Sequence, residues 1–144
     1  MLEELLSPDP QLLNFEEIEF DADMIVVKVM SAEKEVTCPY CQMAAHRTHS
    51  RYIRILDDLP CGERRVKVQW KTRRFFCDNQ RCSYLTFCER LPKVARYYAR
   101  KTKRLQEKQA EIGWALGGEA GKRLACQLNM PISADQLIYQ VQSE

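Results

Sequence analysis

Two pairs of cysteines most constrain how this chain of 144 residues can fold. The first pair, Cys38 and Cys41, has the spacing C-x-x-C, and the second pair, Cys77 and Cys82, has four residues between its members. Zinc prefers four soft ligands in a tetrahedron, and the two pairs brought together would supply them. The sequence therefore predicts a zinc-ribbon-like domain with a structural zinc ion bound by these four cysteines.

Other interpretations of the cysteines stay open from the sequence. The C-x-x-C pair could be a redox motif, although no βαβ pattern surrounds it. The cysteines could also be buried apolar residues, or His46 and His49 could replace one pair as ligands. We expect Cys61, Cys88 and Cys126 to pack as small apolar side chains.

The N-terminus argues against secretion, because it is acidic where a signal peptide would be basic. We therefore expect a cytoplasmic protein, in which clustered cysteines bind metal more often than they form disulfides. The longest apolar run is far shorter than the roughly 20 residues that a membrane-spanning helix needs.

The residues before and between the cysteine pairs carry strand patterns. Residues 15–20 and 24–30 are β-prone runs separated by a short acidic turn, which predicts a hairpin. Residues 65–71 alternate strictly between apolar and polar or basic side chains, and residues 52–56 are also β-prone. We expect a small antiparallel sheet with one basic face, which needs a metal because its apolar face is small.

The pattern becomes helical after the second cysteine pair. The 4-then-3 spacing from Tyr98 to Leu116 predicts a long helix that two glycines end, and a second short helix is expected over residues 119–128. Pro131 cannot continue that helix, and Ser133 starts a third helix as a capping box. The fold class that we predict is α+β, with an N-terminal β-hairpin and a zinc-ribbon-like antiparallel sheet followed by a three-helix helix-turn-helix unit.

Charge is segregated along the chain, although the formal net charge is only +2. Residues 1–37 hold 2 basic and 10 acidic residues, residues 38–110 hold 18 and 6, and residues 111–144 hold 2 and 4. Segregated positive charge is typical of proteins that bind polyanions. The parts that we expect are an acidic N-terminal segment with the hairpin (1–37), a zinc-ribbon-like domain (38–92) and a helical helix-turn-helix domain (93–144).

A helix-turn-helix would place the N-terminal side chains of the last helix at base edges in the DNA major groove. The outward residues predicted there include glutamines, which can contact adenine, and a serine that can reach phosphate. This helix has no Lys or Arg, so phosphate contacts would come from elsewhere. The DNA-binding residues that we predict are Arg73, Arg74, Arg96, Arg100, Lys101, Arg104, Lys122, Arg123, Ser133, Gln136, Tyr139 and Gln140. An ordinary helical hairpin with a solvated polar face is the alternative.

Short motifs spread over nearly the whole chain form a specific combination. They are Cys38-Pro-Tyr-Cys41, His49-Ser-Arg-Tyr52, Asp58-Leu-Pro60, Arg73-Arg-Phe-Phe-Cys77, Glu89-Arg-Leu-Pro92, Tyr98-Ala-Arg-Lys-Thr102, Leu116-Gly-Gly-Glu-Ala-Gly-Lys-Arg-Leu124 and Pro131-Ile-Ser133. With these motifs the chain resembles the N-terminal part of bacterial insertion-sequence transposases of the ISL-three family. The resemblance implies a zinc-binding ribbon and a helix-turn-helix that bind the terminal inverted repeats of a mobile element, followed by a large catalytic domain whose acidic triad binds divalent metal.

The chain departs from the family pattern at several positions. Gln42 stands where a glycine usually follows the first cysteine pair, and a left-handed conformation there would cost roughly 1–2 kcal/mol. Asn129 replaces a turn glycine at a lower cost. Cys61 and Cys88 are not at usual ligand positions. The chain ends at Glu144, before any catalytic triad, so we expect no DNA recombination chemistry from it and no enzymatic activity.

The function that we predict is a sequence-specific DNA-binding module of a transposase, with double-stranded DNA as its partner and no membrane association. A stand-alone zinc-dependent regulator, or a dominant-negative derivative of a transposase, is the alternative. A ribbon that binds RNA or protein is a third hypothesis. The acidic hairpin is the surface at which we expect a second copy of the chain or another protein to bind.

Overall fold

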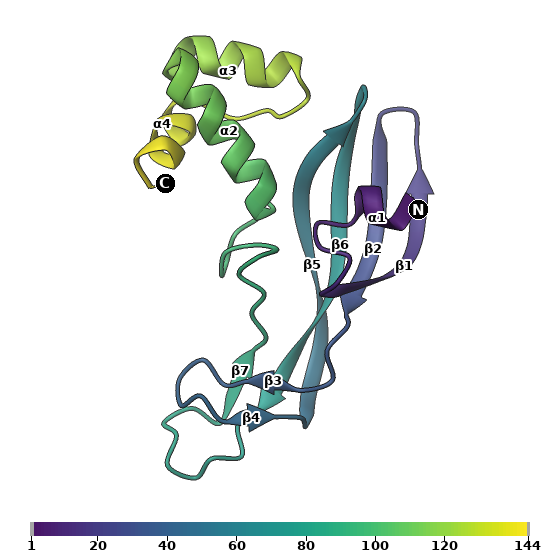
Figure 1. The fold of residues 1–144 in the computed structure, drawn as a ribbon, viewed down its shortest axis with the longest axis vertical. Helices are drawn as coiled ribbons and strands as arrows, with labels where there is room; N and C mark the ends of the chain where they lie inside the picture. The colour runs from purple at the N-terminus through teal and green to yellow at the C-terminus, as the bar shows by residue number, and fades with distance from the viewer. Residues whose placement is uncertain (1, 144) are drawn as a thin grey trace.

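The computed structural model describes residues 2–143, apart from the side chain of Glu3, as a long sheet with a small two-stranded sheet at one end and packed helices near the other (Figure 1). The elements, in chain order, are α1 (Leu2–Leu6), β1 (Leu13–Phe20), β2 (Met24–Ser31), β3 (Val36–Thr37), β4 (Ala44–Ala45), β5 (Thr48–Cys61), β6 (Arg64–Phe76), β7 (Thr86–Cys88), α2 (Lys103–Leu116), α3 (Gly118–Gln127) and α4 (Ala134–Ser143). None of the helices within the described part of the chain is long and apolar enough to cross a membrane.

The large sheet has the strand order β1-β2-β6-β5, and β7 also pairs with β6. The predicted N-terminal hairpin is present as β1 and β2, which are antiparallel. The antiparallel pairing expected within residues 38–92 is confirmed, because β6 is antiparallel to both β5 and β7. The sheet as a whole is mixed, because β2 of the hairpin pairs with β6 in parallel, from Met24 opposite Arg65 to Met30 opposite Lys71. Parallel neighbours need a long crossover connection, and the segment that contains β3, β4 and β5 provides it.

One apolar core lies on a single face of this sheet. The buried side chains alternate along β2 and β6, and the predicted inward residues Val66, Val68 and Trp70 are all buried. Leu6 from α1, together with Val94 and Ala95 from the segment after β7, covers this face. The core therefore draws residues from both sides of the boundaries expected at residues 37 and 92.

A buried carboxylate, Glu89, ties the acidic hairpin to β6. Its Oε1 accepts hydrogen bonds from the Ser31 hydroxyl at 2.7 Å and the Thr72 hydroxyl at 3.3 Å, and Oε2 accepts from Arg73 Nη2 at 3.0 Å. The Trp70 indole donates to the same serine oxygen at 2.9 Å. Because Ser31 is on β2 of the hairpin and the other partners are on β6, this network fixes the hairpin against the ribbon strands.

A second buried carboxylate, Asp58, ties the sheet to the helices. It accepts hydrogen bonds from the Thr102 hydroxyl at 2.7 Å and from Arg104 Nε at 2.8 Å. The same guanidinium donates to the backbone oxygens of Leu6 and Ser7, each at 3.3 Å. Asp58 therefore joins β5, the start of α2 and the end of α1 at one point.

The long helix begins later than the sequence predicts. Thr102 is the N-cap of α2, and its hydroxyl accepts a hydrogen bond from the Leu105 amide. Before it, the Asp57 amide donates to the Arg100 carbonyl and the Thr102 amide donates to the Asp57 carbonyl, each at 2.9 Å. These bonds to β5 hold residues 100–102 extended, so the prediction that the helix includes Tyr98 is wrong.

The three C-terminal helices pack closely because glycines face one another at their crossing. An added Cβ at Gly121 would lie 2.5 Å from Leu137 Cδ2, and one at Gly113 would lie 2.6 Å from Val141 Cγ2. Leu137 is fully buried at this crossing. Asn129, in the turn before α4, has a φ of 60°, so the left-handed conformation expected there is confirmed. We call α2, α3 and α4 the helical unit.

Candidate metal centre and nucleic-acid interface

The four predicted ligand sulfurs lie together at the end of the sheet that carries β3, β4 and β7. The Sγ atoms of Cys38, Cys41, Cys77 and Cys82 are all within 4.8 Å of one another. Cys41 Sγ and Cys77 Sγ are 3.6 Å apart. Four sulfurs in a tetrahedron, each about 2.3 Å from zinc, are separated by roughly 3.8 Å. The cluster therefore has the size and the ligand chemistry of a structural zinc site.

The first pair of cysteines is presented by a tight turn between β3 and β4. The Cys38 amide donates to the Met43 carbonyl at 2.8 Å, and the Gln42 amide donates to the Cys38 carbonyl at 2.9 Å. Gln42 has a φ of 66°, so this turn keeps the left-handed conformation in spite of its cost for a residue that is not glycine. This turn directs the sulfurs of both cysteines to one side.

The second pair is presented by the loop between β6 and β7. Asn79 organises this loop, since its carbonyl accepts from the Cys82 amide at 3.0 Å and its Oδ1 accepts from the Arg81 amide at 3.0 Å. An ion pair between Arg47 and Asp78 joins the loop to the segment after β4. The two halves of the site are therefore held together by contacts other than the metal.

The thiols of Cys41 and Cys77 influence each other's ionisation. A hydrogen bond with the Asn79 side chain, assisted by the Met43 backbone, lowers the pKa of Cys41 to about 6. The backbone of Asn79 lowers the pKa of Cys77, but desolvation and the neighbouring thiols outweigh it and raise this pKa to about 12. Opposite shifts of two adjacent thiols mean that one thiolate disfavours the next, and a divalent cation removes that penalty.

The other cysteines and both histidines lie outside the cluster. His46 and His49 are exposed, and the ring of His49 packs edge-on against Phe76. Cys88 is half-buried. The expectation that Cys61 and Cys126 pack as small apolar side chains is wrong, because both are exposed.

Residues 34–82 match the family model described as the zinc-finger of transposase IS204/IS1001/IS1096/IS1165. These residues form a zinc ribbon of the transposase type. We call them the ribbon, and its four clustered cysteines hold a structural zinc ion. No curated protein and no solved structure matches the chain. The ribbon family implies that DNA is a partner of this chain.

Four of the predicted DNA-binding residues are engaged inside the protein. Arg73 pairs with Glu89 and Arg104 pairs with Asp58. Lys101 Nζ donates to Gln109 Oε1 and Gln140 Oε1, both at 2.8 Å. Desolvation lowers the pKa of this lysine. These cations stabilise the fold.

Gln140 is the clearest correction among these residues. It was expected to face outward on the last helix, but its side chain is buried. Its amide nitrogen donates to the Gln106 carbonyl at 3.3 Å and to Gln109 Oε1 at 3.2 Å. Glutamine is a polar residue that usually faces solvent, and its contact with the half-buried Lys101 joins residues far apart in the chain, so local sequence patterns did not indicate that Gln140 is buried.

The remaining predicted DNA-binding residues are exposed in four places. Gln136 and Tyr139 are on α4, after Ser133, whose hydroxyl caps the helix by accepting from the Gln136 amide at 3.2 Å. Lys122 and Arg123 are on α3, and Arg74 is on β6. Arg96 and Arg100 are in the segment before α2. The prediction that Arg100 and Lys101 lie on a helix is wrong, since α2 begins at Lys103.

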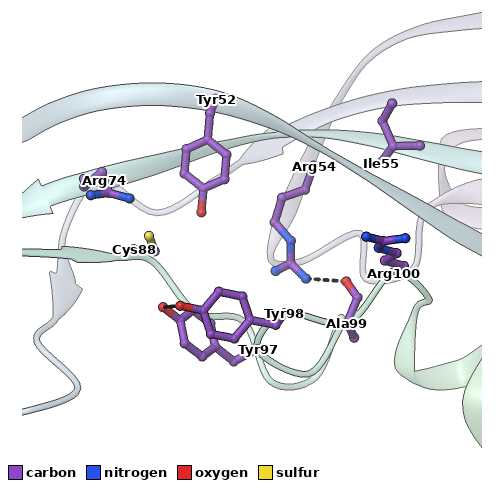
Figure 2. A pocket seen from close by; sticks show the side chains of 9 residues that line it. All are labelled: Tyr52, Arg54, Ile55, Arg74, Cys88, Tyr97, Tyr98, Ala99 and Arg100. Atoms are coloured by element: carbon purple, nitrogen blue, oxygen red, sulfur yellow. Dashed lines mark hydrogen bonds between the residues drawn. The ribbon is translucent and has the colours of Figure 1, made fainter.

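A pocket between β5 and the segment before α2 was not predicted. It has a volume of about 380 Å³, and Figure 2 shows Tyr52 on one side facing Tyr97 and Tyr98 on the other. Arg54 holds this segment in place by donating to the Ala99 carbonyl at 2.7 Å. The sequence feature that could have indicated this pocket is the pair of adjacent tyrosines, Tyr97 and Tyr98, which lie among basic residues.

Proposed function

We propose that this chain is a sequence-specific DNA-binding module of a transposase and that it recognises the terminal inverted repeats of an insertion sequence. The observation that carries the proposal is the match of the ribbon to a transposase zinc-finger family, with its four ligand sulfurs clustered. Sequence is read by contacts to base edges, and an α-helix in the major groove is a common way to make them.

We assign base readout to α3 and α4, acting as a helix-turn-helix. The turn between them contains Asn129 in the left-handed conformation, and the packing of Leu137 against Gly121 fixes the angle between the helices. Gln136 is exposed in the first turn of α4, where such a motif meets base edges, and Tyr139 is exposed one turn later. Lys122 and Arg123, exposed on α3, would contact phosphates beside them.

We also propose that the chain contributes recognition and no strand-transfer chemistry. Within residues 2–143, the two buried carboxylates are Asp58 and Glu89, and each is paired with an arginine. A two-metal site needs carboxylates with free oxygens, and neither of these residues offers them.

Selection on random duplexes with the zinc-loaded chain tests base readout. We expect one motif to be enriched, and we expect Gln136→Ala to relax selection at a single position, where a good bidentate contact contributes about 1–3 kcal/mol of discrimination. Gln142→Ala is the matched control, because Gln142 is also exposed on α4 but lies at its C-terminal end. If no motif is enriched, or if both variants change selection equally, the assignment of α4 to base readout is wrong.

A further inference from the structure

A row of stacked planar side chains runs from the zinc site to the pocket of Figure 2. Tyr84 and Tyr40, on the two cysteine-bearing loops, stack with ring centroids 3.7 Å apart. The Arg90 guanidinium carbon lies 5.4 Å from the Tyr40 ring and 4.0 Å from the Tyr97 ring. Tyr97 then packs against Tyr98 at 3.9 Å. We call these five residues the aromatic ladder.

The ladder is open to solvent along its length. The tyrosines are 39–82% exposed, and Tyr98, the last of them, is the most exposed. Tyr98 buries less than a fifth of its surface, so packing within the protein does not account for the position of this ring. Its last ring lies at the mouth of the pocket, opposite Tyr52 (Figure 2).

Tyr98 is also held in a strained backbone conformation. Its φ is 65°, which is a genuine outlier for a bulky residue that is not glycine. The contacts that maintain it include the hydrogen bond between the Tyr97 and Tyr98 hydroxyls at 3.0 Å and the anchoring of Ala99 by Arg54. Strain that is kept at an exposed side chain is typical of ligand-binding positions.

The charge of the pocket fits an anionic ligand. Arg54, Arg74 and Arg100 line it, and its described lining contains no carboxylate. Within residues 2–143, no ion pair involves Arg74 or Arg100. The volume of about 380 Å³ lies within the range of roughly 300–1,000 Å³ that is usual for small-molecule sites.

We propose that the aromatic ladder and this pocket bind unpaired nucleobases of a single-stranded DNA segment, with Arg74 and Arg100 contacting its phosphates. Aromatic side chains can stack only on bases whose faces are free, and the bases of a duplex cover one another. The ladder would therefore hold a strand that leaves the duplex bound by the helical unit. The inference rests on the proposed function in one respect, which is that the helical unit binds the duplex from which this strand leaves.

The test compares a blunt duplex containing the selected motif with the same duplex carrying a four-nucleotide single-stranded extension at either end. The zinc-loaded full chain is used, and 2-aminopurine in the extension reports stacking by its quenched fluorescence. We expect one extension to tighten binding by about 10-fold or more and to be quenched, since each base stacked on an aromatic ring contributes roughly 5- to 100-fold.

Variants of Tyr98 separate binding from folding. Tyr98→Phe keeps the ring and should keep most of the gain from the extension, whereas Tyr98→Ala should lose most of it. Tyr98→Gly removes the strain of a positive φ, so this variant should melt at a higher temperature than the wild type and still lose the gain. Phe20→Ala is the matched control, because Phe20 is an exposed aromatic residue on the acidic hairpin.

The outcomes distinguish this inference from the proposed function. Tight binding of the blunt duplex with no gain from any extension would overturn the inference alone. If the single-stranded extension binds but the duplex does not, the result would support the inference and contradict the proposed function. A larger gain from an RNA extension than from a DNA extension, or an undiminished gain in Tyr98→Ala, would overturn the assignment of the ladder to unpaired DNA.

Discussion

Replacing Cys77 with serine is expected to release the zinc ion and unfold the ribbon end of the sheet. Cys77 supplies one of four clustered sulfurs, and its neighbours Phe75 and Phe87 belong to a small core that also contains Cys38. Structural zinc contributes about 10–16 kcal/mol to the folding of zinc-finger peptides. So small a core cannot replace a contribution of that size, and we expect the loss of stability to exceed about 4 kcal/mol.

The measurements are zinc content by atomic emission and amide hydrogen exchange across residues 36–45 and 77–88. Cys61→Ser is the matched control, because it makes the same chemical change at an exposed cysteine that lies outside the cluster. Chelation of the wild type should reproduce the exchange pattern of Cys77→Ser. Retention of a full equivalent of zinc in Cys77→Ser would contradict the assignment of this residue as a ligand.

Asp58→Asn is expected to destabilise the whole chain by about 3–5 kcal/mol, because it removes one partner of a buried ion pair. The Asp58 side chain is fully buried, and Arg104 faces it with only 31% of its own side chain exposed. Asparagine keeps the shape of the residue but cannot balance the guanidinium charge. The free energy of unfolding in urea, measured on the zinc-loaded chain, gives the size of the effect.

The neighbouring residue provides a control within the same strand. The Asp57 side chain is 37% exposed and lies 3.4 Å from Lys67 Nζ, so Asp57→Asn should cost no more than about 1 kcal/mol. Adding Arg104→Met to Asp58→Asn should restore part of the lost stability, since the uncompensated charge is then gone. Equal losses for Asp57→Asn and Asp58→Asn would show that this ion pair does not join the sheet to the helices.

Local sequence patterns predicted the parts of the fold that depend on neighbouring residues. The cysteine spacing indicated the metal cluster, the alternation along residues 65–71 indicated the buried face of β6, and Asn129 was placed correctly in a left-handed turn. In each case the physical cause is a short-range one, either a side-chain period or a backbone conformation.

The features that the sequence did not predict depend on partners distant in the chain. The parallel pairing of β2 with β6 joins segments about 40 residues apart. The late start of α2 follows from backbone bonds between Asp57 and residues 100–102. Arg73 and Arg104 appeared to be surface cations because nothing near them in the sequence indicated that Glu89 and Asp58 would be buried beside them.

The dependence of duplex affinity on salt tests the central claim, DNA binding by this zinc-loaded chain, most directly. Five of the Lys and Arg residues predicted to bind DNA are exposed: Arg74, Arg96, Arg100, Lys122 and Arg123. Arg74 and Arg100 are assigned to the single-stranded segment, which leaves Arg96, Lys122 and Arg123 for the duplex. If each of these three neutralises one phosphate, the logarithm of the association constant should fall with the logarithm of salt concentration at a slope of about −2.7. A slope near zero, measured on the duplex that selection enriches, would contradict the claim that this chain binds DNA through these residues.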